Sequence, residues 1–221
     1  MALVARRQAE LESLAEEVKR SGGEAIVLPA DLCRPEEALR VVAEAESNLR
    51  RLDLVIANAG VGSEGPVQQV AWERIYETIM VNTLAPMVTI RAALPGMLQR
   101  KSGYIAGISS LASYRGLPGS GAYSSSKAAL STFLESLRVD TRGLGISVTD
   151  IHPGFVRTEM TAKHKVKLPF LIDVDHAARL ILSAIVRKKP VYDFPWQMAL
   201  LLRIARTLPP SIYDRIVTSK G

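Results

Sequence analysis

The alternation of short apolar runs with longer amphipathic stretches is the feature that most constrains the fold of this chain. The short runs are typical of buried strands, and the longer stretches repeat their apolar residues at helical spacing. This alternation predicts an α/β fold, with a doubly wound parallel sheet covered by helices on both faces. The expected strands are 2–5, 25–28, 52–57, 104–109, 146–151 and 190–192, and the expected helices are 8–21, 35–49, 72–80, 84–100, 122–141 and 173–187.

Length and composition agree with a single domain of this class. The chain has 221 residues, 48% of them apolar, which suffices for one continuous core over residues 1–221. No charge-free apolar stretch is long enough for a membrane span, and the N-terminus lacks the layout of a secretory signal, so we expect a cytoplasmic protein. Cys33 is the only cysteine, which excludes a disulfide framework and a cysteine-based metal site.

The net charge of +6 is compatible with nucleic acid, a membrane surface or an anionic small molecule as partner. The basic residues are spread out, apart from the cluster at 163–167, and no aromatic residues interleave with them. We therefore expect no nucleic-acid partner. The remaining interpretations are a solvated basic surface and a surface that attracts a phosphorylated cofactor.

Ser110, Tyr123 and Lys127 are the strongest functional signal. Tyr123 and Lys127 are four residues apart and share one helix face, and Ser110 ends an apolar run thirteen residues before the tyrosine. A tyrosine ordinarily titrates near ~10, and a nearby ammonium group lowers such a pKa by roughly 1–3 units. We interpret Tyr123 as an acid/base at a carbonyl or alcohol, Lys127 as the group that lowers its pKa, and Ser110 as the residue that orients the reacting oxygen. Taken alone, the Tyr–Lys pair is also compatible with ordinary packing.

Several short motifs follow the expected strands at their carboxyl ends, where open parallel sheets bind their ligands. They are Asp31-Leu32, Asn58-Ala59-Gly60, Ser110 and the run Pro153-Gly154-Phe155-Val156-Arg157-Thr158. Together with Asn82, Tyr123 and Lys127, these motifs resemble the short-chain dehydrogenase/reductase family in order and spacing. The match runs over nearly the whole chain, and one mild departure is Ala57, where the family usually has asparagine.

This resemblance implies a Rossmann-type fold and an NAD(P)-dependent oxidoreductase that interconverts a carbonyl and an alcohol by hydride transfer. Asn82 would complete a proton-transfer tetrad with Ser110, Tyr123 and Lys127. Cofactor contacts would come from these residues: Asp31, Leu32, Asn58, Ala59, Gly60, Tyr123, Lys127, Pro153, Gly154, Val156 and Thr158. The resemblance also implies a homodimer or homotetramer that associates through helices 84–100 and 122–141. No metal is implied.

Each motif also has an ordinary structural interpretation. Asn58-Ala59-Gly60 and Pro153-Gly154 are compatible with simple turns, and Asp31, Asn82 and Thr158 with caps of the helix or turn that follows. The run 60–65 matches the Gly-x-Gly-x-x-Gly pattern, but Pro66 follows and no helix is expected before Trp72. The dinucleotide fingerprint requires a helix at that turn, so we exclude this run as a pyrophosphate site.

Arg6 and Arg7 follow the first expected strand, where a Rossmann unit contacts the adenosine ribose. Arginine there accommodates a 2′-phosphate, and the first acidic residue is only Glu10. We therefore predict NADP, with NAD as the alternative. A further alternative is that both arginines are solvated residues at the start of a helix.

The first expected strand corresponds to the second strand of the resembling family, and that family's glycine-rich Thr-Gly-x-x-x-Gly-x-Gly turn is not in the sequence. Without the first family strand, which is central, two halves of the sheet would remain unpaired. We expect either a shortened reading of a longer protein or a fragment that does not bind cofactor. A non-catalytic, self-associating scaffold is therefore the rival hypothesis.

Three peripheral features of the sequence also carry expectations. Residues 158–172 lack a clear period and are expected to form a lid for a small-molecule substrate. Residues 194–221 are an apolar C-terminal extension with Arg203 and Arg206 on one side. We expect this extension to cover the substrate cleft or contact a partner subunit rather than a membrane. His152, His164 and His176 have no metal-ligand spacing and are interpreted as surface or loop histidines.

Overall fold

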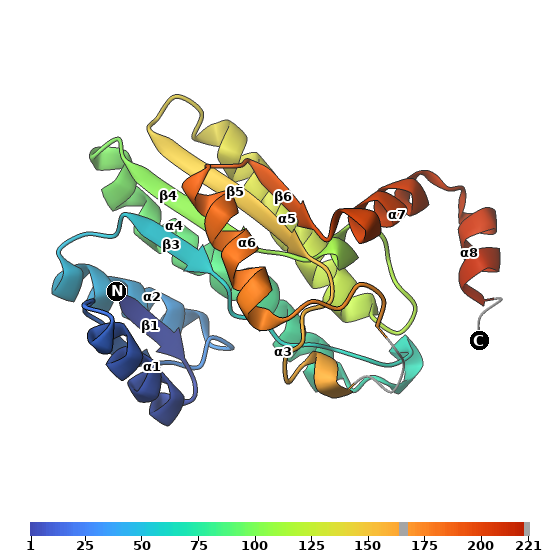
Figure 1. The fold of residues 1–221 in the computed structure, drawn as a ribbon, viewed down its shortest axis with the longest axis horizontal. Helices are drawn as coiled ribbons and strands as arrows, with labels where there is room; N and C mark the ends of the chain where they lie inside the picture. Colours follow the sequence, from blue (N-terminus) through green and yellow to red (C-terminus); the bar gives the residue numbers. More distant parts are fainter. Residues whose placement is uncertain (164–167, 219–221) are drawn as a thin grey trace.

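The computed structural model describes residues 1–163 and 168–218, which form an α/β fold with two parallel sheets (Figure 1). The smaller sheet pairs β1 (Ala2–Ala5) with β2 (Ile26–Pro29). The larger sheet has the order β3-β4-β5-β6, made of β3 (Leu54–Ala57), β4 (Gly103–Ile108), β5 (Ile146–Pro153) and β6 (Val191–Phe194). Both sheets are entirely parallel, as the sequence predicted.

The strands form two separate sheets, which are divided between β2 and β3. β1 and β3 are each hydrogen-bonded to a single neighbouring strand. Leu54 and Ile56 of the edge strand β3 are 40% and 43% exposed, although Val55 between them is buried. The first strand of the chain is β1, which starts at the second residue. That a further family strand belongs between the halves stays a prediction.

Eight α-helices are described within residues 1–163 and 168–218. They are α1 (Gln8–Arg20), α2 (Pro35–Leu49), α3 (Trp72–Ile79), α4 (Ala85–Gln99), α5 (Gly121–Asp140), α6 (Val174–Val186), α7 (Trp196–Thr207) and α8 (Pro210–Thr218). The first six match the predicted helices to within about two residues, which is the usual uncertainty of a boundary. The last two were not predicted as helices.

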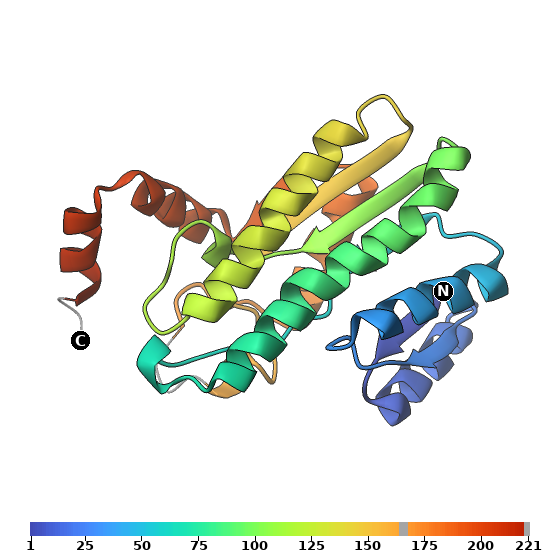
Figure 2. The same ribbon diagram turned by 180° about the vertical axis from the view of Figure 1, so that it is seen from behind.

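Helices cover both faces of the larger sheet. Side chains of α2, α4 and α5 build the core on the face shown in Figure 2, including Ile90 and Met97 of α4 and Leu130 and Leu134 of α5. Ala177 and Ile185 of α6 pack on the opposite face. Gly107 permits the close approach of β4 and α5, because a Cβ at this position would lie 2.2 Å from Cδ1 of Leu134. Gly107 therefore allows α5 to pack closely on the sheet next to the candidate site.

A single helical path runs through α3 and α4, and its middle turn, Met80–Leu84, is a π-helix. Single π turns inside α-helices recur at functional sites, because they rotate one side chain out of the regular pattern. The expected break between the two helices is thus a widened turn rather than an end. Asn82 lies in the middle of it.

Two features are absent from the described residues. No helix there combines the length and apolar composition that crossing a bilayer requires. No group of three or more histidine, cysteine or acidic side chains there is arranged to hold a metal ion.

Candidate active site

Tyr123 and Lys127 lie one turn apart near the start of α5, facing the carboxyl end of β4. The Lys127 side chain is buried, and its Nζ donates a hydrogen bond to the carbonyl of Ile108 at 2.8 Å. The same Nζ lies 6.0 Å from the centroid of the Tyr123 ring. The predicted pair is therefore on one helix face, and the end of a strand holds the lysine in place.

Ser110 follows β4 and is buried at the start of a short 3-10 helix, Leu111–Ser113. Its Oγ accepts a hydrogen bond from the backbone N–H of Ala112 at 3.1 Å and donates to the carbonyl of Pro153 at 3.5 Å. The Ser110 hydroxyl also acts on the phenol of Tyr123, whose pKa it lowers. Ser110 thus links β4, the end of β5 and the tyrosine on α5.

Asn82 is fully buried in the π turn, which its side chain connects to the loop after β3 and to α5. Its Oδ1 accepts from the N–H of Val61 at 2.8 Å, and its Nδ2 donates to the carbonyl of Val61 at 2.9 Å. Nδ2 also donates to Oγ of Ser126 on α5 at 3.0 Å. The interpretation of Asn82 as a helix cap is wrong, because the residue lies inside a continuous helix. It fastens the loop after β3 to the helix that carries Tyr123 and Lys127.

The pKa of Tyr123 is raised overall rather than lowered, so the expected net lowering does not occur in the cofactor-free chain. Burial raises the pKa of Tyr123, and the hydrogen bond from Ser110 only partly opposes it. Burial also lowers the pKa of Lys127 to about 8, although the negative charge of Asp150 opposes this shift. The phenol therefore holds its proton at neutral pH, and Lys127 loses its charge just above the physiological range.

The loop after β3 approaches this group closely at Gly60. A Cβ at Gly60 would lie 3.4 Å from Lys127 Nζ and 3.4 Å from Asn82 Oδ1. A larger residue would therefore crowd the space above the lysine. Gly60 and its neighbours Asn58 and Ala59 join the predicted rim at the carboxyl end of β3. The run 60–65 opens no α-helix, since α3 starts at Trp72, as the sequence predicted; its exclusion as a pyrophosphate site stays a prediction.

The candidate residues of the smaller sheet lie on the surface. Arg6 pairs with Glu77 at 3.4 Å, and Arg7 pairs with Glu10 at 2.9 Å and with Glu159 at 3.3 Å. Asp31 follows β2, and its Oδ1 accepts from the N–H of Cys33 at 3.1 Å. This bond forms a turn, so Asp31 does not cap α2, whose cap position is Arg34.

The loop after β5 brings Pro153 and Gly154 to the same rim. A few residues later, a bridge joins the two ends of the predicted lid. Gly154 allows the start of α7 to pack against β5, because a Cβ there would lie 2.9 Å from Cδ of Pro195. Val156 forms an isolated bridge with Ile172, which closes the base of the predicted lid. Oγ1 of Thr158 accepts from the N–H of Thr161 at 3.4 Å, so Thr158 caps the turn that follows it. Residues 164–167, which include His164 and most of the basic cluster, lie outside the described residues.

Sequence reasoning missed a buried charged cluster beside the site. His152 on β5 is only 2% exposed, so its interpretation as a surface or loop residue is wrong. Its Nδ1 lies 2.8 Å from Asp193 of β6, and its Nε2 lies 3.1 Å from Asp150 and 3.1 Å from Oγ of Ser131. The phenol of Tyr114 donates to Asp193 at 2.9 Å. Ser131 is one turn after Lys127, so the cluster joins the candidate catalytic helix to β5 and β6.

The two carboxylates keep His152 charged. Burial disfavours the imidazolium, but the hydrogen bonds to Asp150 and Asp193 outweigh it and raise the pKa of His152 to about 9. The signal that could have revealed this cluster is a histidine and an aspartate within the buried strand Ile146–Pro153. Polar residues in such a strand need partners.

The comparisons with known proteins agree with this geometry. The family model described as short chain dehydrogenase matches residues 1–168. The chain belongs to the short-chain dehydrogenase/reductase family. It is accordingly an NAD(P)-dependent oxidoreductase of that enzyme family.

Two relatives show how far the similarity extends. An uncharacterized oxidoreductase of Myxococcus xanthus is 42% identical over 209 residues, which are 95% of this chain and 83% of that protein. The ketoacyl reductase HetN of a Nostoc species is 31% identical over 225 residues, covering 96% of this chain and 77% of that protein.

Two solved structures are similar to this chain and contain a nicotinamide cofactor. A short-chain dehydrogenase from Sphingobium yanoikuyae in complex with NADPH has a TM-score of 0.79 and 27% identity, covering 95% of this chain and 87% of that one. A metagenomic short-chain oxidoreductase in complex with NADP has a TM-score of 0.66 and 31% identity, covering 71% and 72%.

Proposed function

We propose that this protein is an NADP-dependent oxidoreductase that reduces a carbonyl to an alcohol, with Tyr123 as the proton donor. The observation that carries the proposal is the convergence of Ser110, Tyr123, Lys127 and Asn82 at the carboxyl ends of β3, β4 and β5. A hydroxyl, a phenol and an amine at one rim are the groups that proton transfer at a single oxygen requires.

The residues present fit a nicotinamide dinucleotide at its two ends. Gly60 itself carries no side chain that could obstruct a ligand, and the polar ends of Lys127 and Asn82 lie beside it. The hydrogen bond to Ile108 uses one of the three N–H donors of the Lys127 ammonium, which leaves capacity for ribose hydroxyls. We assign Asn58, Ala59 and Gly60 to the nucleotide side of the rim. Pro153, Gly154, Val156 and Thr158 would lie beside the nicotinamide, which supplies a hydride when bound.

The protonated state of Tyr123 favours reduction at neutral pH. Negative charge develops on a carbonyl oxygen as it is reduced, and a phenol that holds its proton can donate it to that oxygen. Ser110 would donate a second hydrogen bond to the same oxygen and fix its position. Charged Lys127 would stabilise the phenolate that remains, and Asn82 would position the loop and helix around the group as well as support a proton relay.

Arg6 and Arg7 carry the preference for NADP in this proposal. Both follow β1 and both side chains are more than half exposed; Arg6 pairs with the partly buried Glu77 and Arg7 with the exposed Glu10. A 2′-phosphate offers a stronger, doubly charged partner than one exposed carboxylate. Asp31 and Leu32, at the end of β2, would lie beside the adenine. The alternative is NAD, with both arginines serving only as surface ion pairs.

The predicted lid would bound the substrate, and the ion pair of Arg7 with Glu159 brings it to the cofactor side of the rim. We also propose association of two or four copies through α4 and α5.

The test is NADPH-dependent reduction of a panel of ketones, aldehydes and acyl thioesters by the wild-type chain and two serine variants. Ser110→Ala should lower turnover by roughly 100-fold, because the reacting oxygen loses an orienting donor. Ser125→Ala, on an exposed position of α5, is the matched control and should keep full activity.

Full activity of Ser110→Ala on a substrate reduced by the wild type would contradict the proposed site. A folded wild-type chain that neither binds NADPH nor reduces any member of the panel would favour the non-catalytic rival.

A further inference from the structure

Helices α7 and α8 form an arm that leaves the sheet after β6 and extends away from both sheets (Figures 1 and 2). The body-facing side of the arm is packed: Phe194, which precedes it, and Ala199 are buried. No residue of α8 is buried. The outer surface of the arm is therefore exposed, and the expectation that the extension covers the substrate cleft stays a prediction.

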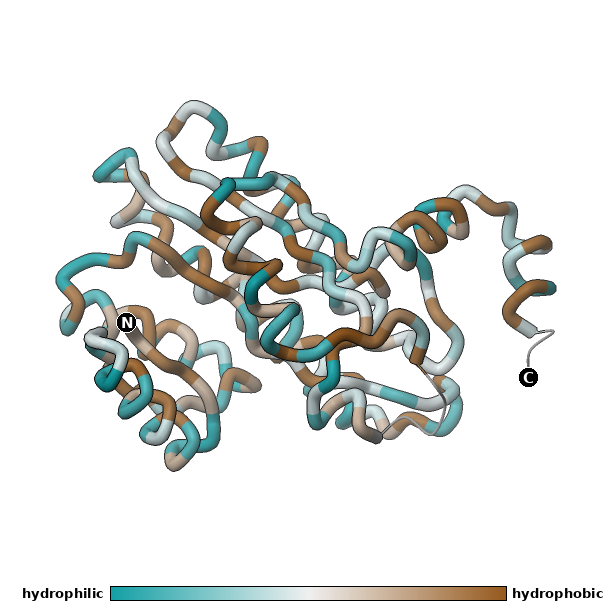
Figure 3. The backbone as a smooth tube through the Cα atoms, viewed as in Figure 1, coloured by the Kyte–Doolittle hydropathy of each residue, from teal (hydrophilic) through white to brown (hydrophobic). Residues whose placement is uncertain are grey.

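A continuous apolar row runs along the outer side of α7. Trp196, Leu200 and Ile204, spaced by four residues, are 69%, 50% and 52% exposed, and Leu201 beside them is 59% exposed. Figure 3 shows hydrophobic segments along the arm, interrupted by hydrophilic ones. We call these four residues the apolar row. Scattered exposed apolar residues are ordinary on a protein surface, but an aligned and contiguous set marks an interaction site.

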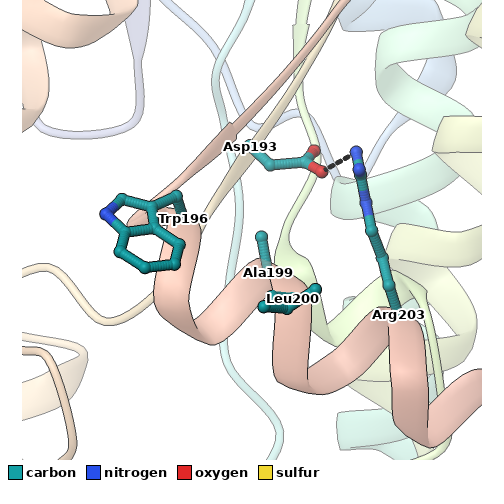
Figure 4. Close-up of a pocket in the computed structure, with 5 residues that line it drawn as sticks. All are labelled: Asp193, Trp196, Ala199, Leu200 and Arg203. Carbon is teal, nitrogen blue, oxygen red and sulfur yellow. Dashed lines mark hydrogen bonds and ion pairs between the residues drawn. The ribbon is translucent and has the colours of Figure 1, made fainter.

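The arm is tied to the body in a way that keeps the apolar row turned outward. Arg203 pairs with the buried Asp193 at 2.5 Å, beside a pocket lined by Trp196, Ala199 and Leu200 (Figure 4). Arg115 donates to the carbonyl of Leu208 at 3.3 Å, and the phenol of Tyr213 donates to the carbonyl of Gly116 at 2.6 Å. These contacts fasten the arm to the body at Arg203, Leu208 and Tyr213, while the four side chains of the apolar row stay 50–69% exposed.

The charge around the row selects between two kinds of partner. Residues 196–218 contain three arginines, Arg203, Arg206 and Arg215, and one acidic residue, Asp214. Arg115 adds a further positive charge where it stacks on Tyr213, 4.3 Å from the ring centroid. A second copy would bring like charges together around an apolar contact, whereas an anionic surface would neutralise them.

We propose that the arm is a membrane-surface anchor, whose apolar row lies in the headgroup region of an anionic bilayer. An amphipathic helix with tryptophan and leucine on one side and arginine at its border is suited to this position. The net charge of +6 adds attraction to the same surface. The attachment is peripheral, because the helix lies in the plane of the interface.

The experiment uses the full chain carrying Trp72→Phe, which leaves Trp196 as the single tryptophan of the two in the sequence. Its fluorescence is measured against vesicles of phosphatidylcholine, with and without phosphatidylglycerol, together with co-sedimentation. We expect a shift to shorter wavelength and co-sedimentation with the anionic vesicles only, both weakened by high salt.

Two matched pairs of substitutions locate the contact. Leu200→Glu/Ile204→Glu should weaken binding to anionic vesicles by at least about tenfold, because two charged groups replace the centre of the row. Leu182→Glu/Val186→Glu, at equal spacing on the exposed face of α6, should leave binding unchanged.

Absence of binding to anionic vesicles, or equal loss in both pairs, would overturn the proposal. An arm that serves a second copy would show a different result: a change of oligomeric state in Leu200→Glu/Ile204→Glu by analytical ultracentrifugation, without vesicle binding by the parent chain. That outcome also overturns it.

Discussion

The candidate proton-transfer residues and the candidate adenosine-binding residues are held in different ways. Around the larger sheet, Asn82, Ser110 and Lys127 are buried and hydrogen-bonded to elements far apart in the sequence. Around the smaller sheet, Arg6 and Arg7 lie on the surface in ion pairs with glutamates. Removal of one buried hydrogen-bond partner costs stability, because the other partner is left unsatisfied. Exposed ion pairs contribute little to stability, so their side chains can change partners easily. The proposed function thus assigns the chemistry to buried residues and the cofactor preference to residues at the surface.

The largest combined effect on activity and stability is expected at Asn82. Asn82→Leu removes the partners of both the N–H and the carbonyl of Val61 and one contact to Ser126, so the loop after β3 separates from α5. We expect turnover to fall by about 100-fold or more and the free energy of unfolding to fall by ~1–3 kcal/mol. Steady-state rates and denaturant titrations measure both. Asn48→Leu on the exposed side of α2 is the control; if it matches Asn82→Leu in both quantities, the special role of Asn82 is refuted.

The buried cluster of His152 should make stability depend on pH. The pKa of His152 is raised from about 6.5 to about 9, so its contribution is complete below pH 6.5 and is lost as pH rises through 9. Each unit of pH within this window changes the free energy of unfolding by about 1.4 kcal/mol, which gives a decrease of roughly 2 kcal/mol between pH 6.5 and 8. Above pH 8 the lowered pKa of Lys127 makes the free energy of unfolding rise with pH, which opposes the effect of His152. The range from pH 6.5 to 8 therefore tests His152 alone.

Denaturant titrations at several pH values measure this slope. His152→Gln should remove it, while His176→Gln, an exposed position on α6, should leave it unchanged. A wild-type protein whose stability is constant between pH 6.5 and 8 would show that the two aspartates do not keep His152 charged.

The activity should fall at alkaline pH because Lys127 loses its charge with a pKa of about 8. Neutral Lys127 no longer stabilises the phenolate of Tyr123, so the rate of carbonyl reduction should decrease about tenfold per pH unit above that value. The pH profile of kcat, measured with saturating cofactor, reports it. A rate that stays constant to pH 9 would remove charged Lys127 from the mechanism.

The smallest effect is expected for cofactor affinity when the exposed residues Arg6 and Arg7 are replaced. Arg6→Ala/Arg7→Ala should weaken NADPH binding by roughly fivefold to tenfold and leave NADH binding nearly unchanged, since only NADPH carries the 2′-phosphate. Fluorescence titration with both cofactors measures the ratio. Arg20→Ala at the other end of α1 is the matched control, and equal affinities of the wild type for NADPH and NADH would exclude NADP preference.

The sequence was sufficient for the elements of the larger sheet and for its rim, because buried parallel strands leave continuous apolar runs and their ends carry the polar motifs. It was insufficient wherever the deciding contact is distant. His152 looks ordinary until Asp193, 41 residues away, is placed beside it. The pKa of Tyr123 depends on burial among separate elements, which the spacing of two residues on one helix does not report.

The C-terminal arm was missed for the opposite reason. Residues 194–208 are apolar on nearly every side, so they lack the clear helical periodicity that distinguished the other helices. Only the ion pair of Arg203 with Asp193 and the contacts of Arg115 determine which side of α7 faces outward.

The most direct test of the buried proton-transfer site is a comparison of NADPH binding with NADPH oxidation in Tyr123→Phe. The substitution removes one hydroxyl and leaves the ring, the helix and the arginines in place. The account predicts NADPH affinity within about twofold of the wild type and turnover lower by at least about 1000-fold, while Tyr76→Phe on the exposed side of α3 keeps both. Turnover of Tyr123→Phe within about tenfold of the wild type would contradict the assignment of Tyr123 as the proton donor.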